Sequence, residues 1–106
     1  MTAVASLLDA EAPHPRAAVF LLRRALEGGL ETYISAHRSA LSRCRTETKV
    51  VWLAHNLDHR LAGRLAAVWR NLSVACHHQQ FALPPTVGEL LGWRDEVAFV
   101  LRALRT

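Results

Sequence analysis

The chain has 106 residues, of which 51% are hydrophobic and 21% charged, and its formal net charge is +4. This length suits one domain with one core, and the balance of apolar and charged residues excludes an intrinsically disordered chain. No apolar stretch approaches the roughly 20 residues that a membrane-spanning helix needs. The two cysteines, Cys44 and Cys76, cannot form a disulfide framework. We therefore expect a cytoplasmic, reduced protein with no membrane partner.

The positive charge comes almost entirely from arginine, since Lys49 is the single lysine. Two explanations remain open: the codon composition of a GC-rich genome, or phosphate recognition by the forked guanidinium group. The charge is compatible with a nucleic-acid ligand but does not establish one. The supply of apolar residues is rich for so short a chain, which favours burial of some apolar surface between subunits.

Residues 1–14 are expected to form a short leader and residues 15–106 a single helical domain. The first long helix should begin at Pro15 or Arg16, because proline is tolerated in a first turn. Its apolar stripe recurs at steps of three or four residues: Val19, Leu22, Leu26, Leu30, Tyr33 and His37. Gly28 and Gly29 lie inside this helix, where each costs about 1 kcal/mol relative to alanine. They predict either a tolerated kink or the close approach of a neighbouring helix.

A polar connection at 39–45 separates the first helix from a second, which Thr46 is expected to N-cap and which extends to about Leu57. Asp58 is expected to cap a third helix that runs to about His78. The apolar stripe of this third helix is Leu61, Leu65, Val68, Leu72 and Ala75 with Cys76.

Pro84 and Pro85 break the third helix from the last one, which Thr86 and Glu89 should start as a capping box. The last helix directs a further set of residues toward the core: Leu90, Trp93 with Arg94, Val97, Leu101 and Leu104. No segment alternates with period two. The sequence therefore predicts an all-α fold, a four- to five-helix up-and-down bundle with antiparallel neighbours.

Arg70 and His77 lie seven residues apart on the third helix. Seven residues advance a helix by about 10 Å and leave the two side chains about 20° apart around its axis. Both therefore face the same direction, with Asn71 beside Arg70. Gly63, seven residues before Arg70, extends this face. A glycine at that position would let another backbone come close, including a second copy of the same helix.

The segment Arg70-Asn71-Leu72-Ser73-Val74-Ala75-Cys76-His77 resembles the arginine, polar residue, spacer and histidine motif of the HEPN superfamily, at the long end of its spacing. The resemblance covers the helix pattern of about 16–104, but only Arg70, Asn71 and His77 as a motif. It implies a small helical bundle, often dimeric, and for many members an RNase activity in toxin–antitoxin or antiphage systems. The expected partners are then a second copy, an RNA substrate, and an antitoxin or another protein from a neighbouring gene. Numerous members have lost catalysis, so a non-catalytic dimerisation or adaptor module is the alternative.

The chemistry of such a motif follows from its residue types. An RNA 2′-hydroxyl attacks the adjacent phosphodiester if a base removes its proton and a cation stabilises the transition state. Histidine is the side chain suited to proton transfer near neutral pH, which is the role open to His77, and Arg70 can donate a fork of hydrogen bonds to phosphate. Asn71 would orient the phosphate or bind a sugar, and no metal or other cofactor is needed. The structural alternative makes Arg70 a salt-bridge residue and lets His77 interact with the end of the helix dipole.

Glu27 and Glu31 on the first helix are one turn apart. They could reach across the bundle to hold Arg70 or His77, as the resemblance implies for an early acidic residue. Alternatively, they pair with Arg23 or Arg24 along their own helix, or face solvent.

Four other hypotheses are weaker. His55 and His59 would share one face for zinc on a continuous helix, but a cap at Asp58 breaks that helix. Cys76 is better placed for the core than for nucleophilic catalysis. The three tryptophans, Trp52, Trp69 and Trp93, suit core or interface anchoring better than base stacking. A nucleic-acid module using Arg60, Arg64 and Arg70 lacks a tight basic stripe.

Overall fold

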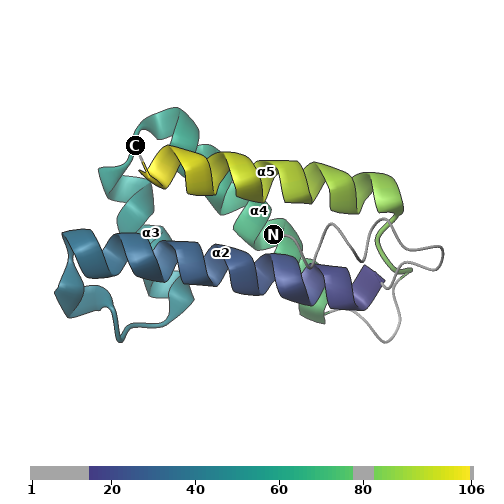
Figure 1. Ribbon diagram of the computed structural model, residues 1–106, viewed down its shortest axis with the longest axis horizontal. Helices are drawn as coiled ribbons and strands as arrows, with labels where there is room; N and C mark the ends of the chain where they lie inside the picture. The colour runs from purple at the N-terminus through teal and green to yellow at the C-terminus, as the bar shows by residue number, and fades with distance from the viewer. Residues whose placement is uncertain (1–14, 78–82, 106) are drawn as a thin grey trace.

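The computed structural model describes residues 15–77 and 83–105, so the predicted leader at 1–14 and His78 lie outside it. Within the described part the chain forms four α-helices and one short 3₁₀ helix, with no strand. The α-helices are α2 (Pro15–His37), α3 (Thr46–Asn56), α4 (His59–His77) and α5 (Val87–Arg105), and the 3₁₀ helix is η1 (Ser39–Leu41). The predicted all-α helical bundle is therefore confirmed, but its neighbours are not all antiparallel, because α2 and α5 contact each other and run in the same direction (Figure 1).

The three long helices, α2, α4 and α5, contact one another pairwise, and the short α3 packs on α4 and α2. In Figure 1, α2 and α5 run in the same direction and α4 runs in the opposite one. The short α3 is steeply inclined to them, at the end of the molecule where α2 finishes. The beginnings of α2 and α5 and the end of α4 consequently meet at the other end of the bundle.

The core is one cluster of mostly aliphatic side chains to which all four α-helices contribute. Its members are Ala18, Val19, Leu22, Leu26, Leu30, Ile34, Val50, Leu53, Leu65, Val68, Trp69, Leu72, Leu90, Val97, Val100 and Leu104. The predicted stripes supply most of this cluster, but Ile34 takes the buried place expected for Tyr33 and His37. The Tyr33 and His37 rings instead stack on each other, with centroids 4.0 Å apart, and His37 is exposed. Tyr33 is partly buried and still packs against the core, so the predicted stripe of α2 was wrong at His37.

Two of the predicted helix caps are present. The Asp58 carboxylate accepts hydrogen bonds from the backbone amides of Arg60 at 3.1 Å and Leu61 at 3.4 Å. Thr86 and Glu89 form the capping box: the Glu89 amide donates to the Thr86 hydroxyl at 3.1 Å, and the Thr86 amide donates to the Glu89 carboxylate at 3.1 Å. These bonds satisfy amides that have no partner inside their helices.

The predicted N-cap at Thr46 was wrong, because Thr46 is the first helical residue of α3. The N-cap residue is Arg45, in an extended conformation and without a side-chain capping bond. The first turn of α3 is held from outside the helix, by the ion pair between the buried Lys49 and Glu31 of α2. The start of this helix is thus stabilised by a contact with another helix, whereas the sequence suggested a capping bond from Thr46 itself.

Of the two adjacent glycines in α2, only Gly29 lies where a larger side chain would clash. A Cβ atom at Gly29 would lie 2.0 Å from the Cδ2 atom of Leu101 on α5, whereas a Cβ atom at Gly28 would meet nothing within 4 Å. The close approach of a neighbouring helix, one of the two predicted explanations, therefore applies to Gly29. Gly28 faces open space. Among the described residues, no helix is both long and apolar enough to cross a membrane.

Candidate functional site

The three residues of the predicted motif lie on α4, and all three are exposed. Arg70 and Asn71 are in the second half of the helix, and His77 is its last residue. No ion pair or side-chain hydrogen bond engages any of them within residues 15–77 and 83–105. Arg23, Arg45, Arg64 and Arg94, by contrast, each have a carboxylate partner. The predicted salt bridge of Arg70 is thus not formed within the described chain, and the motif remains accessible to a ligand.

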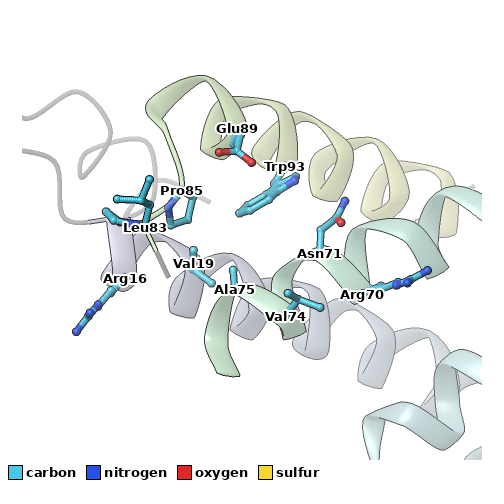
Figure 2. A pocket seen from close by; sticks show the side chains of 11 residues that line it. Arg16, Val19, Arg70, Asn71, Val74, Ala75, Leu83, Pro85, Glu89 and Trp93 are labelled. Carbon is cyan, nitrogen blue, oxygen red and sulfur yellow. The ribbon is translucent and has the colours of Figure 1, made fainter. Parts of the chain in front are cut away.

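A cavity of about 300 Å³ adjoins the motif, at the end of the bundle where α2 and α5 begin. Arg70, Asn71 and Val74 of α4 line it together with Val19 of α2 and Trp93 of α5. Figure 2 shows Trp93 directed from α5 into the space between α4 and α5, and Asn71 projecting from α4 toward α5. Arg70 lies at the edge of the group with its guanidinium directed away from Trp93. His77 is not among the residues that line the cavity.

The antiparallel course of α4 and α5 creates this cavity. Pro84 and Pro85 follow the end of α4, and the capping box starts α5 immediately afterwards, so the first turns of α5 lie beside the last turns of α4. Trp93 of α5 therefore comes close to Asn71. Trp93, which was expected in the core, is half-buried and packs against the core, but it also lines the cavity.

The exposed face of α4 is unusually poor in large side chains. Gly63, Ala66 and Ala67 are exposed on it, and a Cβ atom at Gly63 would meet nothing within 4 Å. Val74 is 51% exposed and is the largest apolar side chain of this face. The face is therefore open to another helix, as the position of Gly63 suggested.

The two acidic residues of α2 are paired elsewhere than at the motif. Glu27 forms an ion pair with Arg23, 3.4 Å apart, and Glu31 pairs with Lys49 of α3 and accepts a hydrogen bond from Ser35 at 2.9 Å. The hydrogen bonds from Lys49 and Ser35 lower the pKa of the Glu31 carboxyl from its ordinary value, although desolvation opposes them. The expectation that Glu27 or Glu31 would hold Arg70 or His77 was wrong. Glu27 pairs along its own helix with Arg23, which was the alternative prediction, and Glu31 pairs with Lys49 of α3.

No group of three or more metal-binding side chains comes together in the part of the chain that the structure describes. His55 and His59 stand on different helices, because α3 ends at Asn56 and Asp58 caps α4. Cys76 is half-buried against the core, which agrees with the expected structural role.

Arg64 does not belong to a basic surface with Arg60 and Arg70. Its guanidinium donates to the Glu96 carboxylate of α5 at 2.5 Å and lies 3.5 Å from the centre of the Phe99 ring. This arrangement joins α4 to α5 and neutralises the charge. It removes one of the three arginines that a helical nucleic-acid module would need.

Comparison with family models, with curated proteins and with solved structures gives no match for this chain.

Proposed function

We propose that the protein is a cytoplasmic, HEPN-like endoribonuclease that cuts single-stranded RNA without a metal ion and works as a homodimer. The observation that carries this proposal is that Arg70, Asn71 and His77 are exposed on one helix, without an ion-pair or side-chain hydrogen-bond partner among residues 15–77 and 83–105, and that a cavity lies directly beside two of them. An arginine without a carboxylate partner keeps all five N–H donors available for a phosphodiester.

The reaction needs proton transfer and charge stabilisation. The ribose 2′-oxygen forms a bond to phosphorus as its proton passes to a base, and the bond from phosphorus to the 5′-oxygen breaks as an acid protonates that oxygen. The products are a 2′,3′-cyclic phosphate and a free 5′-hydroxyl. His77 acts as the base or the acid, and Arg70 stabilises the charge on the phosphate oxygens.

A dimer would bring Arg70 and His77 closer together than they are within one chain. Arg70 and His77 of one chain are separated by about 10 Å along α4, too far for both to contact one phosphate closely. Helical side chains tilt toward the N-terminus, so the tilt moves both groups the same way and does not shorten this separation. One chain alone therefore forms an incomplete site.

An antiparallel pair of α4 helices centred on Val74 completes the site. At about 100° per residue, Arg70 lies about 40° and His77 about 60° to the same side of Val74. A two-fold axis at Val74 then brings His77 of the partner subunit to the level of Asn71, roughly 1.5 Å along the axis from Arg70 and on the same side of the helix pair. In such a pair the two α4 helices overlap over residues 71–77, with Val74 of each chain at the centre.

RNA cleavage by the purified protein in EDTA tests the proposal. We expect cleavage with 2′,3′-cyclic phosphate ends, lost in His77→Ala and in Arg70→Ala with the helical fold retained. His55→Ala and Arg60→Ala, at exposed positions away from the motif, are the matched controls and should cleave normally. Equal cleavage by His77→Ala and the unchanged protein would contradict the role of His77. A cognate inhibitor protein would be expected to suppress the activity.

A non-catalytic dimerisation module is the second candidate, and the open, small-residue face of α4 favours it independently of the motif. It predicts that the dimer persists in the double variant Arg70→Ala with His77→Ala and that RNA is never cut. In this second candidate Gly63→Gln should weaken the dimer, because the added side chain separates the two small-residue faces. In the catalytic dimer centred on Val74, Gly63 lies about 16 Å from the two-fold axis, so the same variant should leave the dimer unchanged. Sedimentation of the variants measures this directly.

A further inference from the structure

The cavity beside the motif has the size and lining of a small-molecule pocket. Its volume of about 300 Å³ is at the lower end of the range for ligand pockets, roughly 300–1,000 Å³, which fits one ring-bearing group rather than a peptide helix. Val19, Val74 and Ala75 give it apolar walls on α2 and α4. Its polar groups, including Arg70 and Asn71, lie among these apolar walls.

Trp93 gives the cavity a flat aromatic surface. The indole is half-buried and points into the space between α4 and α5, near Asn71 (Figure 2). Aromatic side chains of this kind stack on the faces of unpaired nucleobases. The Asn71 amide offers a donor and an acceptor on one edge, the combination that pairs with the N6 and N7 atoms of adenine.

The charged residues of the cavity favour one orientation of a bound nucleotide. Glu89 lines the cavity, and one of its carboxylate oxygens already accepts from the amide of Thr86. This negative group disfavours a phosphate nearby and can accept a hydrogen bond from an exocyclic amino group. Two arginines line the cavity, Arg70 of α4 and Arg16 of α2. Arg70 is the one that adjoins Asn71, whereas Arg16 lies on the far side of the cavity (Figure 2).

We propose that the cavity holds one unpaired adenine of the RNA strand, stacked on Trp93 and read by Asn71, with its phosphate at Arg70. This inference rests on the proposed function, since it assigns the nucleotide next to the cleaved bond. The site then selects its substrate by the base in the cavity, and the enzyme cuts beside unpaired adenines.

Binding of adenosine 3′-monophosphate to the full chain tests the cavity separately from catalysis. The indole N–H signals of Trp52, Trp69 and Trp93 can be followed in a nitrogen-15 NMR spectrum and assigned with Trp→Phe variants. We expect the Trp93 signal to shift with added nucleotide and the Trp52 signal, on α3, to stay in place. Uridine 3′-monophosphate should bind roughly 5- to 150-fold more weakly, the discrimination of one bidentate base contact. Inorganic phosphate should leave the Trp93 signal unmoved.

Three variants test separately the stacking on Trp93 and the free space beside Ala75. Trp93→Ala should weaken binding roughly 5- to 150-fold, whereas Trp93→Phe, which keeps a ring, should retain most of the affinity. Ala75→Leu fills the cavity with a side chain that helices accommodate well, and it should abolish binding with the fold retained. Ala54→Leu, at an exposed position of α3, is the matched control.

The outcomes distinguish the two proposals. If the nucleotide binds at Trp93 but RNA is never cut, the cavity assignment stands and the RNase proposal fails. If RNA is cut but Ala75→Leu cleaves every sequence as the unchanged protein does, the cavity assignment fails and the RNase proposal stands. An adenine-containing RNA heptamer should bind more tightly than the mononucleotide. Equal affinity would overturn the RNA source and identify a site for free nucleotide.

Discussion

The adjacent glycines of α2 allow the packing of α2 against α5 to be tested with one substitution at two positions. Alanine in place of glycine inside a helix gains about 1 kcal/mol of intrinsic helix stability. At Gly28 the new methyl group meets nothing within 4 Å, so Gly28→Ala should stabilise the protein by about 1 kcal/mol. At Gly29 the same methyl group would lie 2.0 Å from Leu101 Cδ2, and Leu101 must change its rotamer or move away.

Such overpacking costs typically 1–3 kcal/mol, which cancels or exceeds the helix-propensity gain. We expect Gly29→Ala to be destabilising by about 1 kcal/mol, so that the two variants differ by about 2 kcal/mol. Urea denaturation followed by circular dichroism measures both free energies of unfolding. In a Leu101→Ala background the clash is removed, and Gly29→Ala should then stabilise like Gly28→Ala.

Equal stabilisation by Gly28→Ala and Gly29→Ala in the unchanged background would refute this reasoning. It would mean that the Leu101 side chain moves aside at little cost, or that α5 does not approach α2 closely at Gly29.

Two further predictions concern the helix start of α4 and the ion pair of α2 with α3. Asp58→Ala should lower the free energy of unfolding by about 0.5–2 kcal/mol, because two backbone amides lose their acceptor. Thr46→Ala should be close to neutral. Thermal denaturation compares the two variants, and an equal loss of stability would contradict the assignment of the caps. The pKa of Glu31 is lowered in the folded state, so its carboxylate contributes stability above the unfolded pKa of 4.5, and this contribution is lost as the pH falls through the folded value. Glu31→Gln should therefore lower the urea midpoint at neutral pH. In acid below the folded and unfolded pKa values of Glu31, the variant should have the same midpoint as the unchanged protein. An effect of the variant that does not depend on pH would contradict the ion pair with Lys49.

Local chemistry made several elements of the fold predictable. Asp58 and the pair of Thr86 and Glu89 have side chains that satisfy amides within three residues, so the sequence alone located these two helix starts. The helical period of apolar residues located most core positions of α4 and α5, but the predicted stripes did not include the buried Ala62, Trp69 and Val100. Thr46 failed as a cap because its helix is anchored by Lys49, whose partner Glu31 lies 18 residues away and is brought close only by packing.

The candidate site was predictable only in part, for the same reason. Arg70, Asn71 and His77 are close in sequence on one helix, so their shared face followed from helical geometry. The cavity depends on which side chains of α2 and α5 face α4, and Trp93 was assigned to the core because a tryptophan at a helical stripe usually belongs there. The Pro84–Pro85 break was the available signal, since a short connection places the start of α5 beside the end of α4.

Complementation between two inactive variants tests the shared catalytic site most directly. Arg70→Ala and His77→Ala would each be inactive alone, but a mixed dimer contains one site with Arg70 from one chain and His77 from the other. Random exchange makes roughly half of the dimers mixed, each with one of two sites intact, so the mixture should recover roughly a quarter of the unchanged activity. A mixture as inactive as either variant alone, beside an active unchanged protein, would contradict a site built from two subunits.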